Sequence, residues 1–136
     1  MRLHLPGVMA AVLLIGAQGT DDEVKKLQGI WAVVSAEVEG EKKTADEVKS
    51  WTVTIKDKML RLETPARKRV GKFTLDPSQK PKAMNWTGLG TKGAPSPYIY
   101  ELNGDTLKLC WREPGGERPT EFTGKDTAGF LILKKK

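Results

Sequence analysis

Short runs in which apolar and polar residues alternate, separated by turn residues, dominate this chain. In the clearest run, Trp51, Val53 and Ile55 share one face, whereas the intervening residues are polar. A side-chain period of two is typical of a β-strand with one buried face. No segment calls for a long internal helix. The alternation therefore predicts an all-β fold.

The runs predict eight or nine short strands. We expect strands at residues 29–38, 51–56, 60–63, 69–75, 82–87, 98–102, 106–111, 120–123 and 130–134. Two short helices are also predicted, one that ends at Leu27 and one that begins after the N-cap candidate Thr44. Residues 88–97 are the longest segment without predicted structure.

Asn103 and Gly104 lie between two alternating runs, which is the strongest short-range signal for a β-hairpin. Tight turns without helical crossovers favour antiparallel strands in an up-and-down order. Closing such a sheet into a barrel removes its exposed edges. A two-sheet sandwich has the same strand count and pattern, so the periodicity alone leaves barrel and sandwich open.

Residues 1–19 have the features of a secretory signal peptide. A positively charged start precedes an apolar run from Leu5 to Ile15, and small residues precede the cleavage expected before Thr20. The run is much shorter than the roughly twenty residues of a bilayer-spanning helix. A buried helix is the alternative interpretation. We expect an exported protein, periplasmic or extracellular, whose single domain, residues 20–136, does not span a membrane after the leader is removed.

Several motifs recur in the order found in a known family. They are Leu27-x-Gly29-x-Trp31, Asp76-Pro77 with Lys80-Pro81-Lys82-Ala83, Tyr100-x-Leu102-x-Gly104-Asp105-x-Leu107-x-x-Cys110, and Arg118-Pro119-x-x-Phe122. On these motifs the chain resembles the lipocalin-like domain family of unknown function that is abundant in planctomycete bacteria. The resemblance implies a small antiparallel up-and-down lipocalin-like barrel of about eight strands, with short helices near the N-terminus and after the first strand. It implies no activity or ligand, because the family has none assigned.

The resemblance also implies a structural motif at one end of the barrel. In larger lipocalins the tryptophan of the first strand packs at the closed end, beneath an arginine from near the last strand. Gly29, Trp31 and Arg118 are the corresponding residues here, and Arg112 is the other candidate arginine. A contact between a guanidinium group and an indole ring stabilises by roughly 0.5–2 kcal/mol.

The composition excludes several kinds of catalysis. His4 is the only histidine and is removed with the leader, so the usual base of Ser-His-Asp and Cys-His sites is missing. Histidine-containing zinc sites lack their ligands for the same reason. Glycosidase-type catalysis is not excluded, because it needs only two carboxylates, but the sequence singles out no pair of acids. We expect no enzyme, no cofactor and no metal site.

Cys110 is the only cysteine, so no internal disulfide can form. We expect it to be a small buried hydrophobe; an intermolecular disulfide or a reactive thiol is the alternative. The net charge is +6, and basic residues are interleaved with acidic ones over most of the length; the densest basic clusters are residues 67–69 and 134–136. Stacking aromatic residues are absent beside these clusters, so they are interpreted as solvated charge and no specific nucleic acid is expected as a partner.

These inferences favour a non-catalytic binding module for a small apolar or amphipathic ligand inside the barrel. The alternative is a structural or protein-interaction domain of the cell envelope, with a filled barrel and an outer face that holds an envelope protein or polymer. The candidate lining residues are Trp51, Val53, Leu60, Leu62, Phe73, Met84, Trp86, Tyr98, Tyr100, Leu107, Leu109 and Trp111.

Overall fold

The computed structural model describes residues 19–136, so the predicted leader lies outside the described residues except for Gly19. Residues 19–27 are helical. The elements that follow are β1 (Gly29–Val38), β2 (Glu41–Lys42), α2 (Ala45–Val48), β3 (Thr52–Lys56), β4 (Met59–Glu63), β5 (Lys68–Asp76), β6 (Lys82–Gly88), β7 (Ser96–Asn103), β8 (Thr106–Trp111) and β9 (Gly129–Lys135).

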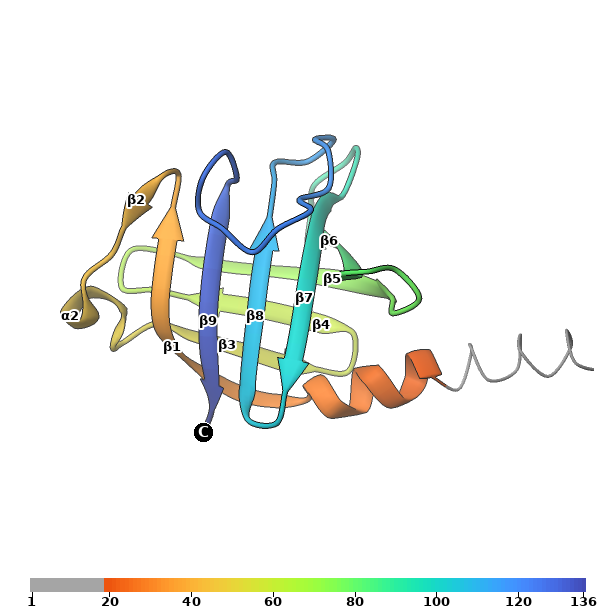
Figure 1. Cartoon of the computed structure of the whole chain (residues 1–136), viewed down its shortest axis with the longest axis horizontal. Helices are drawn as coiled ribbons and strands as arrows, with labels where there is room; N and C mark the ends of the chain where they lie inside the picture. The colour runs from red at the N-terminus through yellow and green to blue at the C-terminus, as the bar shows by residue number, and fades with distance from the viewer. Residues whose placement is uncertain (1–18) are drawn as a thin grey trace, which may run out of the picture.

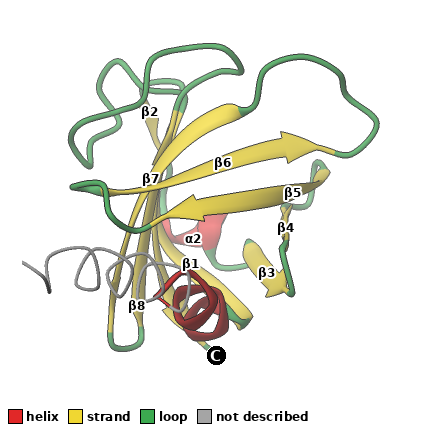
Figure 2. Ribbon diagram, turned by 90° about the vertical axis from the view of Figure 1, so that its right-hand side faces the viewer, coloured by secondary structure: helices red, strands yellow, loops and turns green. Residues whose placement is uncertain are grey.

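The strands form one closed antiparallel barrel (Figures 1 and 2). Strands β3 to β9 pair in sequence order, and β1 pairs with both β3 and β9. The start of β1 pairs with β3, whereas Trp31 to Val38 pairs with β9, with a register shift between Val33 and Ser35. The two-residue β2 adds to β1 outside the closed ring. This closure decides between barrel and sandwich and confirms the predicted all-β, lipocalin-like class.

Local sequence signals set most element boundaries. Gly104 adopts a φ of 61° in the turn between β7 and β8, where glycine has no steric penalty. Thr44 caps α2 through a capping box, in which its hydroxyl accepts from the Glu47 N–H and the Glu47 carboxylate accepts from the Thr44 N–H. The predicted helix after the first strand is therefore confirmed.

One predicted strand is absent, and another begins two residues earlier than predicted. Residues 120–123 are not a strand but part of an irregular segment, residues 112–128, and β7 begins at Ser96 rather than at Tyr98. The longest connection within residues 19–136 is therefore 112–128, not 88–97. This segment crosses the outer face of β7, β8 and β9 (Figure 1). Its β-type residues pack on the outside of the barrel instead of joining the sheet.

Cys110 lies under that crossing segment. The thiol is buried and donates to the carbonyls of Glu121 (3.5 Å) and Thr123 (3.3 Å). The ring of Phe122 packs on Phe130, with 6.4 Å between centroids. Burial raises the pKa of the Cys110 thiol. The cysteine is thus a small buried hydrophobe, as predicted, and its thiol donates a weak hydrogen bond to the covering segment.

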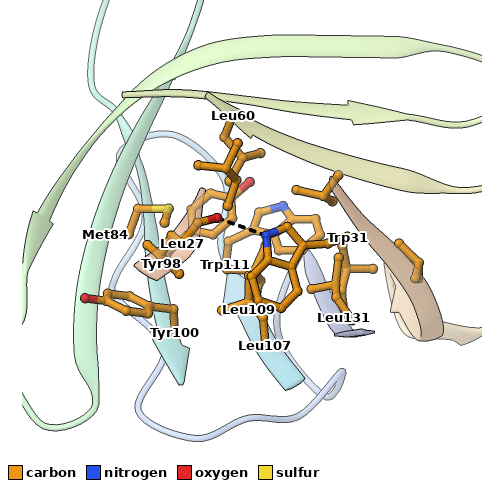
Figure 3. Packing of buried hydrophobic residues seen from close by; sticks show 14 of the residues in the cluster. Leu27, Trp31, Leu60, Met84, Tyr98, Tyr100, Leu107, Leu109, Trp111 and Leu131 are labelled. Carbon is orange, nitrogen blue, oxygen red and sulfur yellow. Dashed lines mark hydrogen bonds between the residues drawn. The ribbon is translucent and has the colours of Figure 1, made fainter. Parts of the chain in front are cut away.

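The predicted lining residues point into the barrel, where most of them fill one apolar cluster (Figure 3). Trp51 and Leu62 are only partly buried and pack against this cluster. Val53 and Leu107 are 0% exposed, so no space large enough for a water molecule touches them. The middle of the barrel is therefore filled by its own side chains.

Trp31 anchors the end of the barrel that the N-terminal helix covers. It is 0% exposed, and its Nε1 donates to the Leu27 carbonyl at 2.9 Å, as Figure 3 shows. The cation over its ring is Lys135, whose Nζ lies 5.6 Å from the ring centroid. Arg118 is elsewhere, so the predicted arginine contact is wrong. Lys135 takes this place because it is the register partner of Trp31 across β1 and β9.

Arg118 instead ties β6 to β7. Its guanidinium donates to the carbonyls of Met84 (3.0 Å) and Tyr98 (2.9 Å), and to Asn85 Oδ1 at 2.7 Å. Arg112, the other candidate, donates to the carbonyls of Asp126 and Glu117 within the crossing segment. Both arginines therefore satisfy backbone carbonyls rather than contacting Trp31.

Glu23 fixes the N-terminal helix to the strands. Its Oε1 accepts from Lys82 Nζ at 2.9 Å and from the Tyr100 hydroxyl at 2.9 Å, and the side chain is 8% exposed. Burial alone would raise the pKa of Glu23, but the hydrogen bonds from Lys82 and Tyr100 outweigh it, and the pKa lies below its usual value. The carboxylate is therefore held in its charged form at this end of the barrel.

Replacing Trp31 with alanine should lower the free energy of unfolding by about 3–5 kcal/mol, because it removes a fully buried indole and its hydrogen bond. Urea unfolding followed by circular dichroism measures the loss. Ile30→Ala is the matched control, since Ile30 is 49% exposed on the same strand and should change stability by less than about 0.5 kcal/mol. Equal losses in the two variants would contradict the structural role of Trp31.

Glu23→Gln should lower the free energy of unfolding by about 1–2 kcal/mol at pH 7, a value reduced because Lys82 is partly exposed. Since folding lowers the pKa of Glu23, its contribution is complete above the unfolded value near 4.5 and is lost as the pH falls through the folded pKa. The difference between wild type and variant should therefore shrink between pH 5 and pH 3 in urea titrations. Glu101→Gln, an exposed change of the same type, should show little difference at any pH.

Candidate functional site

The end of the barrel opposite the N-terminal helix is where buried side chains regain some exposure. Antiparallel order brings the segments 39–40, 64–67, 89–95 and 112–128 to this open end. Trp86, Tyr98 and Trp111 are each 7% exposed, more than the residues deeper in the cluster. The partly buried Trp51 and Leu62 belong to the same inward-facing set. The candidate site is therefore the open end, not the filled middle.

Three aromatic rings form a continuous row there. Tyr98 and Trp111 are directly paired across β7 and β8, and their rings stack at 5.1 Å with an interplanar angle of 15°. Trp86 and Tyr98 have centroids 6.5 Å apart at 51°. Figure 3 shows Tyr98 and Trp111 from this row among the buried side chains. Offset and tilted contacts of this kind favour a fixed arrangement of the rings.

Two glycines on neighbouring strands make room for the indoles. A Cβ on Gly71 would lie 2.5 Å from the Trp86 ring, and a Cβ on Gly129 would lie 2.4 Å from the Trp111 ring. Neither distance is tolerable for a side-chain carbon. The two glycines therefore let both indoles approach the strand backbone closely.

Three polar groups at this end have no hydrogen-bond partner among the described residues. They are the hydroxyls of Ser96 and Tyr98 and the Nε1 of Trp111, on side chains that are 4%, 7% and 7% exposed. No sealed side-chain nitrogen or oxygen in residues 19–136 lacks a partner, so these atoms face space that a water molecule can reach. A ligand entering the open end would therefore meet unsatisfied hydrogen-bonding groups.

Other polar aromatic side chains differ in this respect. Trp31 Nε1 donates to Leu27, Trp86 Nε1 donates to the Leu60 carbonyl at 3.2 Å, and the Tyr100 hydroxyl donates to Glu23. Burial raises the pKa of Tyr98, and the nearby Arg69 charge opposes this only in part. The Tyr98 hydroxyl is thus protonated at neutral pH and available as a donor.

A pocket of about 280 Å³ lies beside the aromatic row. Its lining includes Arg69 and Lys92 and contains no carboxylate; Trp86 is the member of the aromatic row, and Ser96 the unpartnered polar residue, that line it. Arg69 pairs with Leu62 across β5 and β4, and directly paired residues of antiparallel strands share a face. Because Leu62 packs against the core, Arg69 extends from the inner face of the barrel, and its Cζ lies 5.5 Å from the Trp86 ring centroid.

The cations of this pocket differ in their ion pairs. Lys68 lies 3.9 Å from Glu63, which also pairs with Arg61 at 3.0 Å. Arg69 and Lys92 form no ion pair with a described residue. The pocket therefore presents two uncompensated positive charges next to an aromatic surface.

Three other surface pockets are less suited to a ligand. In one of about 330 Å³ beside Phe122, the polar groups of Lys82 and Tyr100 already donate to Glu23. A pocket of about 610 Å³ beside Glu39 and Ala128 includes Arg112, but that guanidinium is already bound to backbone carbonyls. A pocket of about 200 Å³ beside Asn85 is lined by Arg118, whose guanidinium is likewise bound to backbone carbonyls. Within residues 19–136, no group of three or more His, Cys, Asp or Glu side chains is placed to hold a metal ion.

Sequence reasoning identified Trp86, Tyr98, Trp111, Trp51 and Leu62 as lining residues, and the structure brings all five to the open half of the barrel. It missed Arg69, Lys92 and Ser96. Arg69 was taken as solvated charge, although its place in the alternation with Gly71 and Phe73 puts it on the inner face. The deeper predicted residues, such as Leu107, fill the middle and do not reach the site.

Comparison with known proteins found no matching family model, no matching curated protein and no matching solved structure. Membership of the lipocalin-like family thus stays a prediction from the motifs. In the described part of the chain, no helix combines the length and hydropathy needed to cross a membrane.

Gly129→Ala should displace the Trp111 ring, lower the free energy of unfolding by about 1–3 kcal/mol and alter the near-ultraviolet circular dichroism of the aromatic row. Gly88→Ala is the matched control, because a Cβ there would meet its nearest neighbour at 3.4 Å, an ordinary contact. An unchanged near-ultraviolet spectrum in Gly129→Ala would show that the glycine does not position Trp111.

Proposed function

We propose that this protein is an exported, non-catalytic binding module that takes one small amphipathic ligand at the open end of its barrel. The observation that carries the proposal is the set of unpartnered polar groups on Ser96, Tyr98 and Trp111. Buried polar groups normally have a partner in a folded protein. Here the arrangement combines them with aromatic surface and a pocket, which is the usual composition of a small-molecule site.

The filled middle of the barrel sets the depth of the proposed site. Because Val53 and Leu107 leave no accessible space, a ligand would rest on the aromatic row and extend toward the segments of the open end. It would be small, in keeping with a pocket of about 280 Å³. The proposed export rests on the leader-like features of residues 1–19.

Intrinsic fluorescence tests this function, because Trp86 and Trp111 lie in the row whereas Trp31 lies at the other end. Titration with a short amphiphile such as octanoate should shift the emission saturably. The shift should persist in Trp31→Phe, provided that this variant is folded, and should be reduced in Trp86→Phe, because Trp86 lines the pocket. A flat response to a series of octyl and aromatic amphiphiles would reject the proposal and favour the filled structural or protein-interaction domain.

A further inference from the structure

The charges around the open end indicate which kind of ligand it takes. All charged residues that line the pocket beside the aromatic row are cations: Lys68, Arg69 and Lys92. Lys68 is offset by Glu63, which leaves Arg69 and Lys92 without an ion-pair partner in the described chain. An entering group therefore experiences a net positive potential, which favours an anion over a neutral or cationic group.

Arg69 is exposed at the rim of the open end, but it differs from the other surface cations because it extends from an inward-facing strand position. Its guanidinium lies over the Trp86 ring at 5.5 Å. Stacking on an indole restricts the guanidinium while leaving its N–H groups free to donate. An arginine fixed in this way loses less conformational entropy when it binds a planar acid group.

The polar groups of Trp111 and Tyr98 can also donate hydrogen bonds to an acceptor on the ligand. Trp111 Nε1 can only donate, and the protonated Tyr98 hydroxyl can donate. Neither has a partner among the described residues, and Arg69 is close enough to Tyr98 to act on its ionisation. In the order of their contacts, Arg69 lies over Trp86, Trp86 contacts Tyr98, and Tyr98 stacks on Trp111.

We propose that the ligand is a small amphipathic carboxylate, whose acid group binds Arg69 and Lys92 at the rim and whose apolar body lies on the row of Trp86, Tyr98 and Trp111. This inference rests on the proposed function and specifies its ligand class. A carboxylate fits because it is planar and bidentate like the guanidinium, and because the pocket is small.

The test compares probes that share an eight-carbon chain and differ in the head group: octanoate, 1-octanol and octylammonium. Tryptophan fluorescence titrations at pH 7 and low salt give the three dissociation constants. Octanoate should bind roughly tenfold more tightly than octanol, the size expected for one charge-assisted hydrogen-bonded pair. Octylammonium should bind more weakly than octanol.

Arg69→Gln should bring the affinity for octanoate close to the affinity that the same variant has for octanol. Arg69→Lys should retain part of the preference. Arg67→Gln is the matched control, because Arg67 is exposed two positions away and does not line the pocket. Unfolding curves of each variant establish that it is folded.

The outcomes separate this inference from the proposed function. If octanoate and octanol bind equally well, or if Arg67→Gln and Arg69→Gln have the same effect, the anion preference is wrong while the binding function stands. If octyl phosphate binds and octanoate does not, the site takes a phosphate head group and the carboxylate assignment is overturned. If no probe changes the fluorescence, both proposals fail.

Discussion

The pairing of β1 with β9 is the contact on which the rest of this structure depends. It joins the first and last strands into a closed sheet, so that neither strand presents an unpaired edge. The same register places Lys135 beside Trp31. A shift of one residue in this pairing would reverse the faces of one strand and expose its core side chains. The register that closes the barrel therefore also determines which side chains form its core.

Closure also separates the two ends of the barrel in their polar chemistry. At the helix-covered end, the polar groups of Glu23, Tyr100 and Trp31 are all satisfied by side chains or carbonyls. At the open end, Ser96, Tyr98 and Trp111 are nearly as buried. Their side-chain polar atoms, two hydroxyls and the indole Nε1, have no hydrogen-bond partner among the described residues. The first arrangement stabilises the fold. The second leaves hydrogen-bonding capacity that only a solvent molecule or a ligand can use.

Much of the fold could be predicted because it depends on local patterns. The strand at Gly29–Val38 and the hairpin around Gly104 follow from alternation and turn chemistry, and the structure has both. The partner of Trp31 could not be found in this way, because it depends on the register between strands about a hundred residues apart. Residues 120–123 have strand-like composition, yet they cover Cys110 from outside. The composition of residues 120–123 does not distinguish a strand from a segment that covers the sheet.

The candidate site was only half predictable, for a related reason. Its aromatic residues were evident from the inward-facing alternation, whereas Arg69 stood in a basic cluster that resembles solvated charge. Pairing with Leu62 turns that side chain inward, and the glycine at position 71 gives the neighbouring Trp86 ring the room to lie beneath it. An arginine at an inner position costs stability unless water or an anion reaches it. Arg69 is exposed at the open end, so water solvates its guanidinium, and because it forms no ion pair with a described carboxylate its charge stays available to a ligand.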